Sequence, residues 1–101
     1  VWLAPIQARI IPITERHHSY AHELAAEMKE AGIRVDVDAR SEKMGYKIRE
    51  GQLQKIPYML VVGDKEVESR TVSVRKRGEG DLGSRPSTDF INELVREIKA
   101  R

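Results

Sequence analysis

PYMLVVG, at residues 57–63, is the stretch that decides the fold class of this 101-residue chain. The five residues between the proline and the glycine are all apolar and rich in β-formers. A short run of this kind is typical of a central strand that is covered on both faces. The proline also ends any helix before it, because the residue preceding a proline is disfavoured in helical geometry. The run therefore predicts the central strand of a sheet, entered from a helix.

Two further strands and two helices are predicted upstream of this run. Residues 8–13 (ARIIPI) predict a strand, and Thr14 can cap the helix that follows it. Residues 33–38 (IRVDVD) alternate apolar and polar side chains, which predicts a half-buried strand. Ser41 can cap a second helix over residues 42–55. The first helix has one apolar face, with i, i+3, i+4, i+7 spacing, made of Ala21, Leu24, Ala25 and Met28. This alternation predicts parallel strands joined by right-handed crossovers.

The segments after the run complete a mixed sheet. Residues 66–68 and 71–75 predict two short strands, and residues 78–86 (GEGDLGSRP) predict a loop because they contain three glycines. Ser87 or Thr88 can cap a last helix, whose apolar stripe consists of Phe90, Ile91, Leu94, Val95 and Ile98. The predicted order is approximately βαβαβββα. We therefore expect an α/β domain in roughly three layers, with a mixed five-stranded sheet and three helices.

Length and composition favour one globular domain. A chain of 101 residues with 40% hydrophobic and 34% charged residues can bury one core and is too apolar to be disordered. No apolar run approaches the ~20 residues of a membrane span, and no signal peptide is visible. The absence of cysteine excludes disulfides, thiolate catalysis and cysteine-based zinc sites, and it fits an intracellular protein. Because the first residue is Val1, we expect a piece cut from a longer protein.

Positive charge is concentrated in two segments. The net charge of +2 says little by itself, but residues 39–55 sum to +3 and residues 70–77 to +4. The other three segments of the chain are each net negative. A polyanion would meet the two basic segments first. An ordinary solvated face near a turn explains the same pattern, so charge alone leaves both interpretations open.

The three histidines are close in sequence, at positions His17, His18 and His22. His18 and His22 have the i, i+4 spacing that can hold a metal ion on a helix. A third ligand and an H-E-x-x-H pattern are both missing. We expect exposed polar side chains at the start of a surface helix and no metal site.

Two other patterns suggest catalysis only weakly. Residues 78–83 match G-x-G-x-x-G, but this fingerprint belongs after the first strand of a βαβ unit rather than before the last helix. Asp36 and Asp38 could act as an acid–base pair. We expect them instead on the solvent face of their strand, and we assign no catalytic residue.

The carboxyl ends of parallel strands form the usual ligand crevice in an open α/β sheet. One of these ends leads through Ser41 into the basic second helix, and we expect Glu66 and Arg75 near the same edge. An arginine can donate two hydrogen bonds to guanine, and a glutamate can accept from base amino and imino groups. Unpaired RNA exposes these base edges. A surface Glu–Arg ion pair, worth about 1 kcal/mol or less, is the simpler alternative.

The sequence also resembles a known family over nearly its whole length. The matching stretches are WLAPIQ (residues 2–7), AGIRV (31–35), EKMGYKIRE (42–50), QKIPYMLVVGDKEVE (54–68), VRKR (74–77) and DLGS (81–84). Together they resemble the C-terminal anticodon-binding domain of bacterial threonyl-tRNA synthetase, a class II aminoacyl-tRNA synthetase. The resemblance implies a five-stranded mixed sheet with three helices.

The resemblance also implies that the chain binds the anticodon loop of threonine tRNA. It assigns contacts with anticodon bases to Glu66, Arg75 and Ser41. The family commonly has asparagine where this sequence has Ser41, in R-S-E-K, and a hydroxyl is shorter than an amide. Basic side chains expected to hold the RNA backbone are Lys43, Lys47, Arg49 and Arg77.

The family enzyme joins threonine to tRNA with ATP and zinc in a catalytic domain, so we expect no cofactor here. The resemblance implies a linker at residues 1–6, an anticodon-binding domain at 7–101, a cytoplasmic location and a homodimeric parent enzyme whose isolated domain is a monomer. Two alternatives stay open: a protein-interaction module on the same fold, or the anticodon domain of another class II synthetase.

Overall fold

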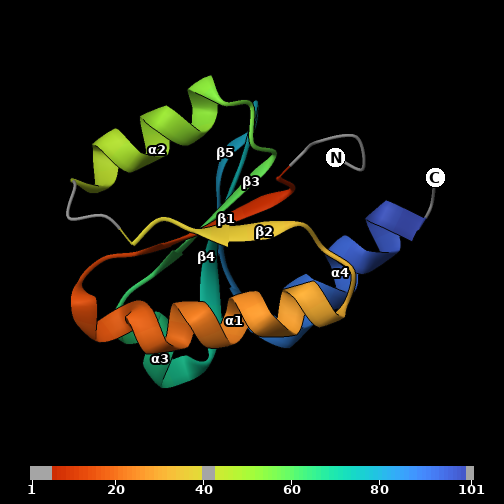
Figure 1. Ribbon diagram of the computed structural model, residues 1–101, viewed down its shortest axis with the longest axis horizontal. Coiled ribbons are helices and arrows are strands. Elements are labelled where there is room, and N and C mark those ends of the chain that lie inside the picture. Colours follow the sequence, from red (N-terminus) through yellow and green to blue (C-terminus); the bar gives the residue numbers. More distant parts are fainter. Residues whose placement is uncertain (1–5, 40–42, 100–101) are drawn as a thin grey trace.

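A five-stranded mixed sheet forms the middle of the computed structural model, which describes residues 6–39 and 43–99 (Figure 1). The strands are β1 (Ala8–Pro12), β2 (Val35–Val37), β3 (Tyr58–Val62), β4 (Thr71–Lys76) and β5 (Gly80–Pro86). Their order across the sheet is β2-β1-β3-β4-β5. β1 is parallel to β2 and β3, whereas β4 is antiparallel to β3 and β5. The predicted central strand is therefore confirmed, as is the mixed five-stranded sheet.

Helices cover both faces of this sheet. They are the 3-10 helix η1 (Glu15–His17), α1 (His18–Glu30), α2 (Met44–Leu53), α3 (Asp64–Ser69) and α4 (Ser87–Lys99). Figure 1 shows α1 and α4 on one face and α2 on the other, with α3 beside α1. No helix within the described ranges is long and apolar enough to cross a membrane.

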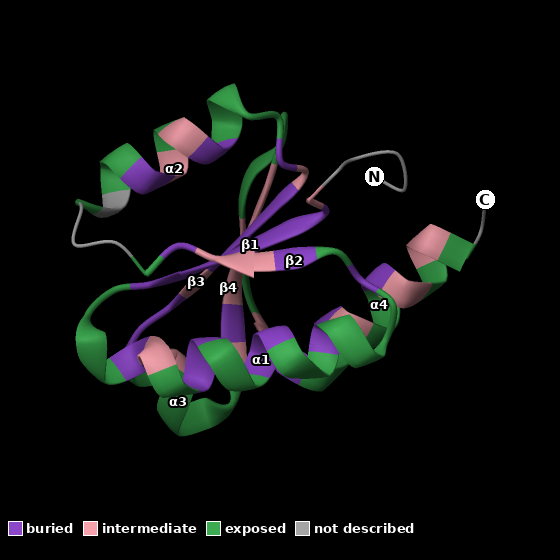
Figure 2. Ribbon diagram, viewed as in Figure 1, coloured by how far each residue is buried: buried purple, intermediate pink, exposed green. Residues whose placement is uncertain are grey.

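The main core lies between the sheet and the α1–α4 layer. Figure 2 shows buried positions along the strands and on the inner sides of the helices. Alternate residues of β3 face opposite sides, so Leu60 joins the cluster under α1 and α4 while Met59 faces α2. A Cβ built on Gly51 of α2 would lie 2.5 Å from Met59 Sδ. The glycine, which costs about 1 kcal/mol in a helix interior, therefore lets α2 approach the sheet closely.

The expected strand at residues 66–68 is wrong, because these residues belong to α3. Gly63 is the N-cap of this helix, and its backbone N–H donates to Oε1 of Glu66 at 2.7 Å. This is the reciprocal half of a capping box, which favours a helix start. Arg70 then adopts a left-handed conformation, with φ 56°, and turns the chain into β4.

The expected loop at residues 78–86 is also wrong, because most of it forms β5. Val72 pairs with Arg85 and Val74 with Gly83 in an antiparallel ladder, with a bulge between Val74 and Arg75. Gly80 and Gly83 have positive φ angles of 80° and 88°. These two glycines belong to an irregular edge strand rather than to a loop. A short helix thus replaces the fourth predicted strand, and this segment supplies the fifth.

Candidate nucleic-acid interface

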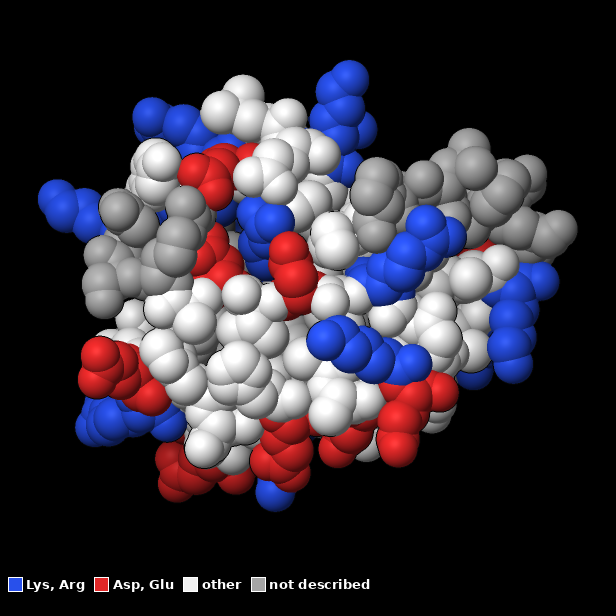
Figure 3. Space-filling view, in the orientation of Figure 1, with Lys and Arg blue, Asp and Glu red and all other residues white. Residues whose placement is uncertain are grey.

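Charge is distributed unevenly over the surface. Figure 3 shows many Lys and Arg side chains along the rim that carries α2, and most of the visible Asp and Glu side chains along the opposite rim, although both signs also occur elsewhere on this face. Exposed residues of the acidic rim are Glu23, Glu27, Glu30, Asp64 and Glu68. The α2 rim is therefore the candidate surface for a polyanion.

The sheet face under α2 is only partly covered. α2 packs against β1 and, through Gly51, against Met59 of β3. On β4, Val72 and Val74 are buried in the core under α1 and α4, so Ser73 and Arg75 point to the α2 side. Both are half-buried, as is typical at the border of a covered area. The β4–β5 half of this face is therefore accessible to a ligand.

Arg75 lies in this accessible half, opposite Met59 of β3 and Asp81 of β5. Its Nε is buried and has no hydrogen-bond partner among the described residues. A buried donor without a partner costs about 1–3 kcal/mol, and an incoming acceptor would remove this cost. Because Nε is buried, a ligand can use this donor only when the Arg75 side chain turns toward the accessible side of the sheet.

Glu66 lies at the beginning of α3, beyond the carboxyl end of β3. Its Oε1 accepts from the Gly63 N–H at 2.7 Å, which fixes the direction of the carboxylate. The second oxygen makes no hydrogen bond with the part of the chain that the structure describes. Glu66 is half-buried and can offer this oxygen to a donor on a ligand.

The structure does not bring Glu66 and Arg75 to the same edge, so this part of our expectation is wrong. Arg75 is opposite Met59 near the amino end of β3, whereas Glu66 follows the carboxyl end at Val62. About 10 Å of strand separates Met59, which is opposite Arg75, from Val62, where β3 ends before Glu66. A ligand that meets both side chains must span this distance.

Three of the four predicted backbone-binding cations are exposed. Lys43 and Arg49 lie at the amino end and on the outer side of α2. Arg77 follows β4, and its backbone N–H donates to the Pro57 carbonyl at 2.8 Å, next to the amino end of β3. Ser41 lies outside the described residues.

Lys47 needs a correction, because its side chain does not reach the surface. The residue is 3% exposed, and Nζ donates to the backbone carbonyl of Asp38 at 3.1 Å. The amine thereby ties α2 to the chain segment after β2. We no longer count it among the contacts with an RNA backbone.

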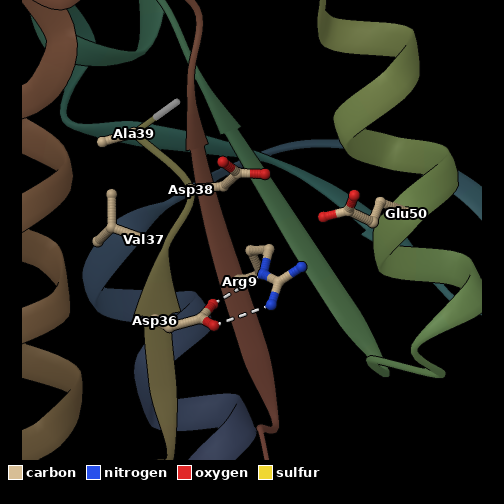
Figure 4. A pocket seen from close by; sticks show the side chains of 6 residues that line it. All are labelled: Arg9, Asp36, Val37, Asp38, Ala39 and Glu50. Atoms are coloured by element: carbon tan, nitrogen blue, oxygen red, sulfur yellow. Dashed lines mark hydrogen bonds and ion pairs between the residues drawn. The ribbon is translucent and has the colours of Figure 1, made fainter. Parts of the chain in front are cut away.

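A pocket of about 190 Å³ lies between β1, β2 and α2 and includes Arg9, Asp36, Asp38 and Glu50 (Figure 4). Arg9 donates from Nε and Nη2 to both oxygens of Asp36, each at 2.9 Å, and this hydrogen bonding raises the pKa of Arg9. Our prediction of a solvent face is wrong for Asp38, which is buried, whereas the Asp36 side chain is partly exposed. Three carboxylates beside one guanidinium make this pocket unfavourable for a phosphate.

Metal ligands do not gather in the described ranges, where no group of three or more His, Asp or Glu side chains could hold an ion. His18 is half-buried, His22 is exposed and His17 is buried. The expectation of an exposed side chain is therefore wrong for His17.

Family comparison identifies the kind of domain that carries this surface. The family described as anticodon binding domain matches residues 7–98. The chain belongs to this family. The architecture of anticodon-binding domains therefore accounts for the mixed sheet and for the helices on both faces.

Close relatives are threonine–tRNA ligases. The chain is 61% identical to the ligase of Syntrophomonas wolfei over 98% of its length, and 54% identical to that of Carboxydothermus hydrogenoformans over 100%. It spans 16% of each of these relatives. The resemblance to the anticodon-binding domain of bacterial threonyl-tRNA synthetase is thereby confirmed.

Solved structures agree on the fold. The RNA binding domain of threonyl-tRNA synthetase from Cryptosporidium parvum is 29% identical with a TM-score of 0.78, covering 98% of this chain and 24% of that one. Prolyl-tRNA synthetase from the same organism is also 29% identical, with a TM-score of 0.82, covering 97% of this chain and 22% of that one. Because synthetases for two amino acids share the fold, the fold by itself does not select the tRNA.

Proposed function

We propose that this chain binds the anticodon loop of threonine tRNA as part of a threonine–tRNA ligase. The observation that carries the proposal is Arg75, a half-buried arginine with an unpartnered Nε on the accessible half of the sheet. An arginine guanidinium can present two parallel donors to a base edge. The identity to threonine–tRNA ligases of 61% and 54% supports threonine tRNA as the ligand.

Base reading is proposed for Arg75, Glu66 and Ser41. Arg75 would donate to acceptors on one base, and the free oxygen of Glu66 would accept from the amino or imino group of another. The separation of about 10 Å along β3 suits two different bases of an unpaired loop better than one base. Unstacked loop nucleotides can be spread over a sheet in this way.

Backbone phosphates are proposed to contact Lys43, Arg49 and Arg77. These side chains are exposed at the amino end of α2, on its outer side and directly after β4. Contacts with phosphates orient the RNA without selecting its sequence. We therefore assign affinity chiefly to these cations and selectivity chiefly to the base readers.

The larger assembly is also a proposal. We propose that the ligase is a cytoplasmic homodimer whose subunits join outside this chain, and that the isolated domain is a monomer. ATP and zinc would bind in the catalytic part of the ligase, and this chain would need no cofactor of its own.

The proposal is tested by titrating the chain with two anticodon stem-loops at a fixed moderate salt concentration. One carries the threonine anticodon, and the other has the same stem with an exchanged anticodon. Preferred binding of the threonine stem-loop, by about 1–3 kcal/mol per base read, is the expected result. Equal and weak binding of both would refute it and favour a protein-interaction module that meets an acidic partner.

A further inference from the structure

The short helix α3, which carries Glu66, lacks the buried apolar residues that anchor α1 and α4. None of the residues of α3 is buried, and Val67, its only large apolar residue, is 37% exposed. A helix of six residues is also too short to be stable by itself. Polar contacts therefore contribute to the direction in which α3 presents Glu66.

The strongest of these contacts comes from a buried histidine. His17, at the end of η1, is 3% exposed. The Thr14 backbone N–H donates to its Nδ1 at 3.1 Å, so Nδ1 carries no hydrogen and the neutral ring is protonated on Nε2. Nε2 then donates to Oδ1 of Asp64 at 2.7 Å. A backbone group thus sets the tautomer that the contact with Asp64 requires.

The hydrogen bond from His17 to Asp64 also restrains the first turn of α3. Asp64 is the first residue of the helix, and Glu66 lies two positions later in the same turn. The hydrogen bond from His17 lowers the pKa of the Asp64 carboxyl, so the carboxylate stays ionised. Arg16 also donates to Asp64, at 3.0 Å, but both of these side chains are exposed. An exposed ion pair adds little restraint, whereas the buried ring has a fixed place in the core.

We propose that His17 is a positioning residue for base recognition. Its imidazole holds Asp64, and with it the first turn of α3, so that the capped carboxylate of Glu66 meets the RNA in one direction. The inference rests on the proposed role of Glu66 as a base reader. It goes beyond that role because His17 itself would touch no nucleotide.

The test uses two replacements of His17. For each variant, the affinity for the threonine stem-loop is divided by the affinity for the exchanged stem-loop, and this affinity ratio is compared with that of the original chain. His17→Phe keeps a planar ring but removes both polar atoms. His17→Gln keeps one acceptor and one donor, as in the neutral imidazole. We expect His17→Phe to lower the ratio by about fivefold to tenfold and His17→Gln to restore most of it. Arg16→Ala, which removes the exposed contact to the same carboxylate, is the matched control and should leave the ratio unchanged.

A double-mutant cycle with Glu66→Ala separates this inference from the proposed function. If His17 acts through Glu66, His17→Phe has no further effect on the ratio in the Glu66→Ala background. An equal loss in both backgrounds would overturn the positioning role. An unchanged ratio in His17→Phe, together with a loss in Glu66→Ala, would overturn it while leaving Glu66 as a reader. An unchanged ratio in Glu66→Ala would overturn both.

Asp64 provides a second route if His17→Phe does not fold. Its side chain is 69% exposed, so substitution there should not disturb the core. Asp64→Asn keeps an acceptor for the Nε2 hydrogen, whereas Asp64→Ala does not. The inference expects a loss of the affinity ratio in Asp64→Ala and retention in Asp64→Asn. Equal ratios in the two variants would contradict it.

Discussion

Replacing Lys47 by methionine removes a buried ammonium group while keeping most of the volume of the side chain. The structure assigns this group to folding, because Nζ donates to the Asp38 carbonyl and the residue is 3% exposed. The substitution removes this charge-assisted hydrogen bond, which is worth about 1.5–3 kcal/mol. Part of the cost is offset, since a charge no longer has to be buried. We expect a net loss of about 1–2 kcal/mol in the free energy of unfolding.

Urea denaturation and thermal unfolding measure this effect. A loss of about 1–2 kcal/mol lowers the Tm of a domain of this size by roughly 5–10 °C. The matched control is Lys43→Met, the same chemical change at an exposed position beside the amino end of α2. It should leave the free energy of unfolding within about 0.5 kcal/mol of the original.

For the salt dependence of stem-loop binding, the order of the two variants should be reversed: Lys43→Met should have the larger effect and Lys47→Met none. Each phosphate contact with a single strand contributes about −0.7 to the slope of log affinity against log salt concentration. Lys43→Met should therefore reduce the size of the slope by about 0.7, and Lys47→Met should leave it unchanged. A reduced slope in Lys47→Met with undiminished stability would refute our assignment of Lys47 to the fold.

Two further predictions concern the core. Burial, assisted by a hydrogen bond to Glu97, raises the pKa of Tyr58 to about 12, so its phenolate should appear in an absorbance titration well above the ordinary pH of about 10. Because the raised pKa favours the neutral phenol in the folded state, its stabilising effect should be complete below about pH 10 and lost towards pH 12; Glu97→Gln should lower the pKa without restoring the ordinary value. Gly51→Ala should destabilise the domain to urea by about 1–3 kcal/mol through overlap with Met59, whereas Gly45→Ala, with open space around its Cβ, should not.

Elements with a strong apolar signal could be predicted from the sequence. The run at residues 58–62 forms a central strand, because a run of five apolar residues between a proline and a glycine is too short for a helix and suits a buried strand. β5 could not be found in this way, since it is an edge strand whose residues are mostly exposed. The α3 helix was missed because the alternation in Glu66, Val67 and Glu68 resembles a strand. Glu66 three residues after an N-cap glycine was the available signal for a helix.

The errors in secondary structure also affected the site that was predicted from the sequence. Mistaking residues 66–68 for a strand beside β4 put Glu66 and Arg75 at one edge, whereas the register puts them at opposite ends of β3. The burial of Lys47 could have been suspected, because it is four residues before Gly51 and so shares its face of α2. The proposed role of His17 could not be predicted from the sequence, since only the tertiary fold brings this residue to Asp64, 47 positions away.

The affinity ratio of the Arg75→Ala variant tests the central claim most directly. The original chain and the variant are each titrated with the threonine stem-loop and with the exchanged stem-loop at one salt concentration. If Arg75 reads a base, the variant loses about 1–3 kcal/mol of binding to the threonine stem-loop, and the ratio between the two stem-loops falls. A variant that binds both stem-loops with the original affinities would contradict the account.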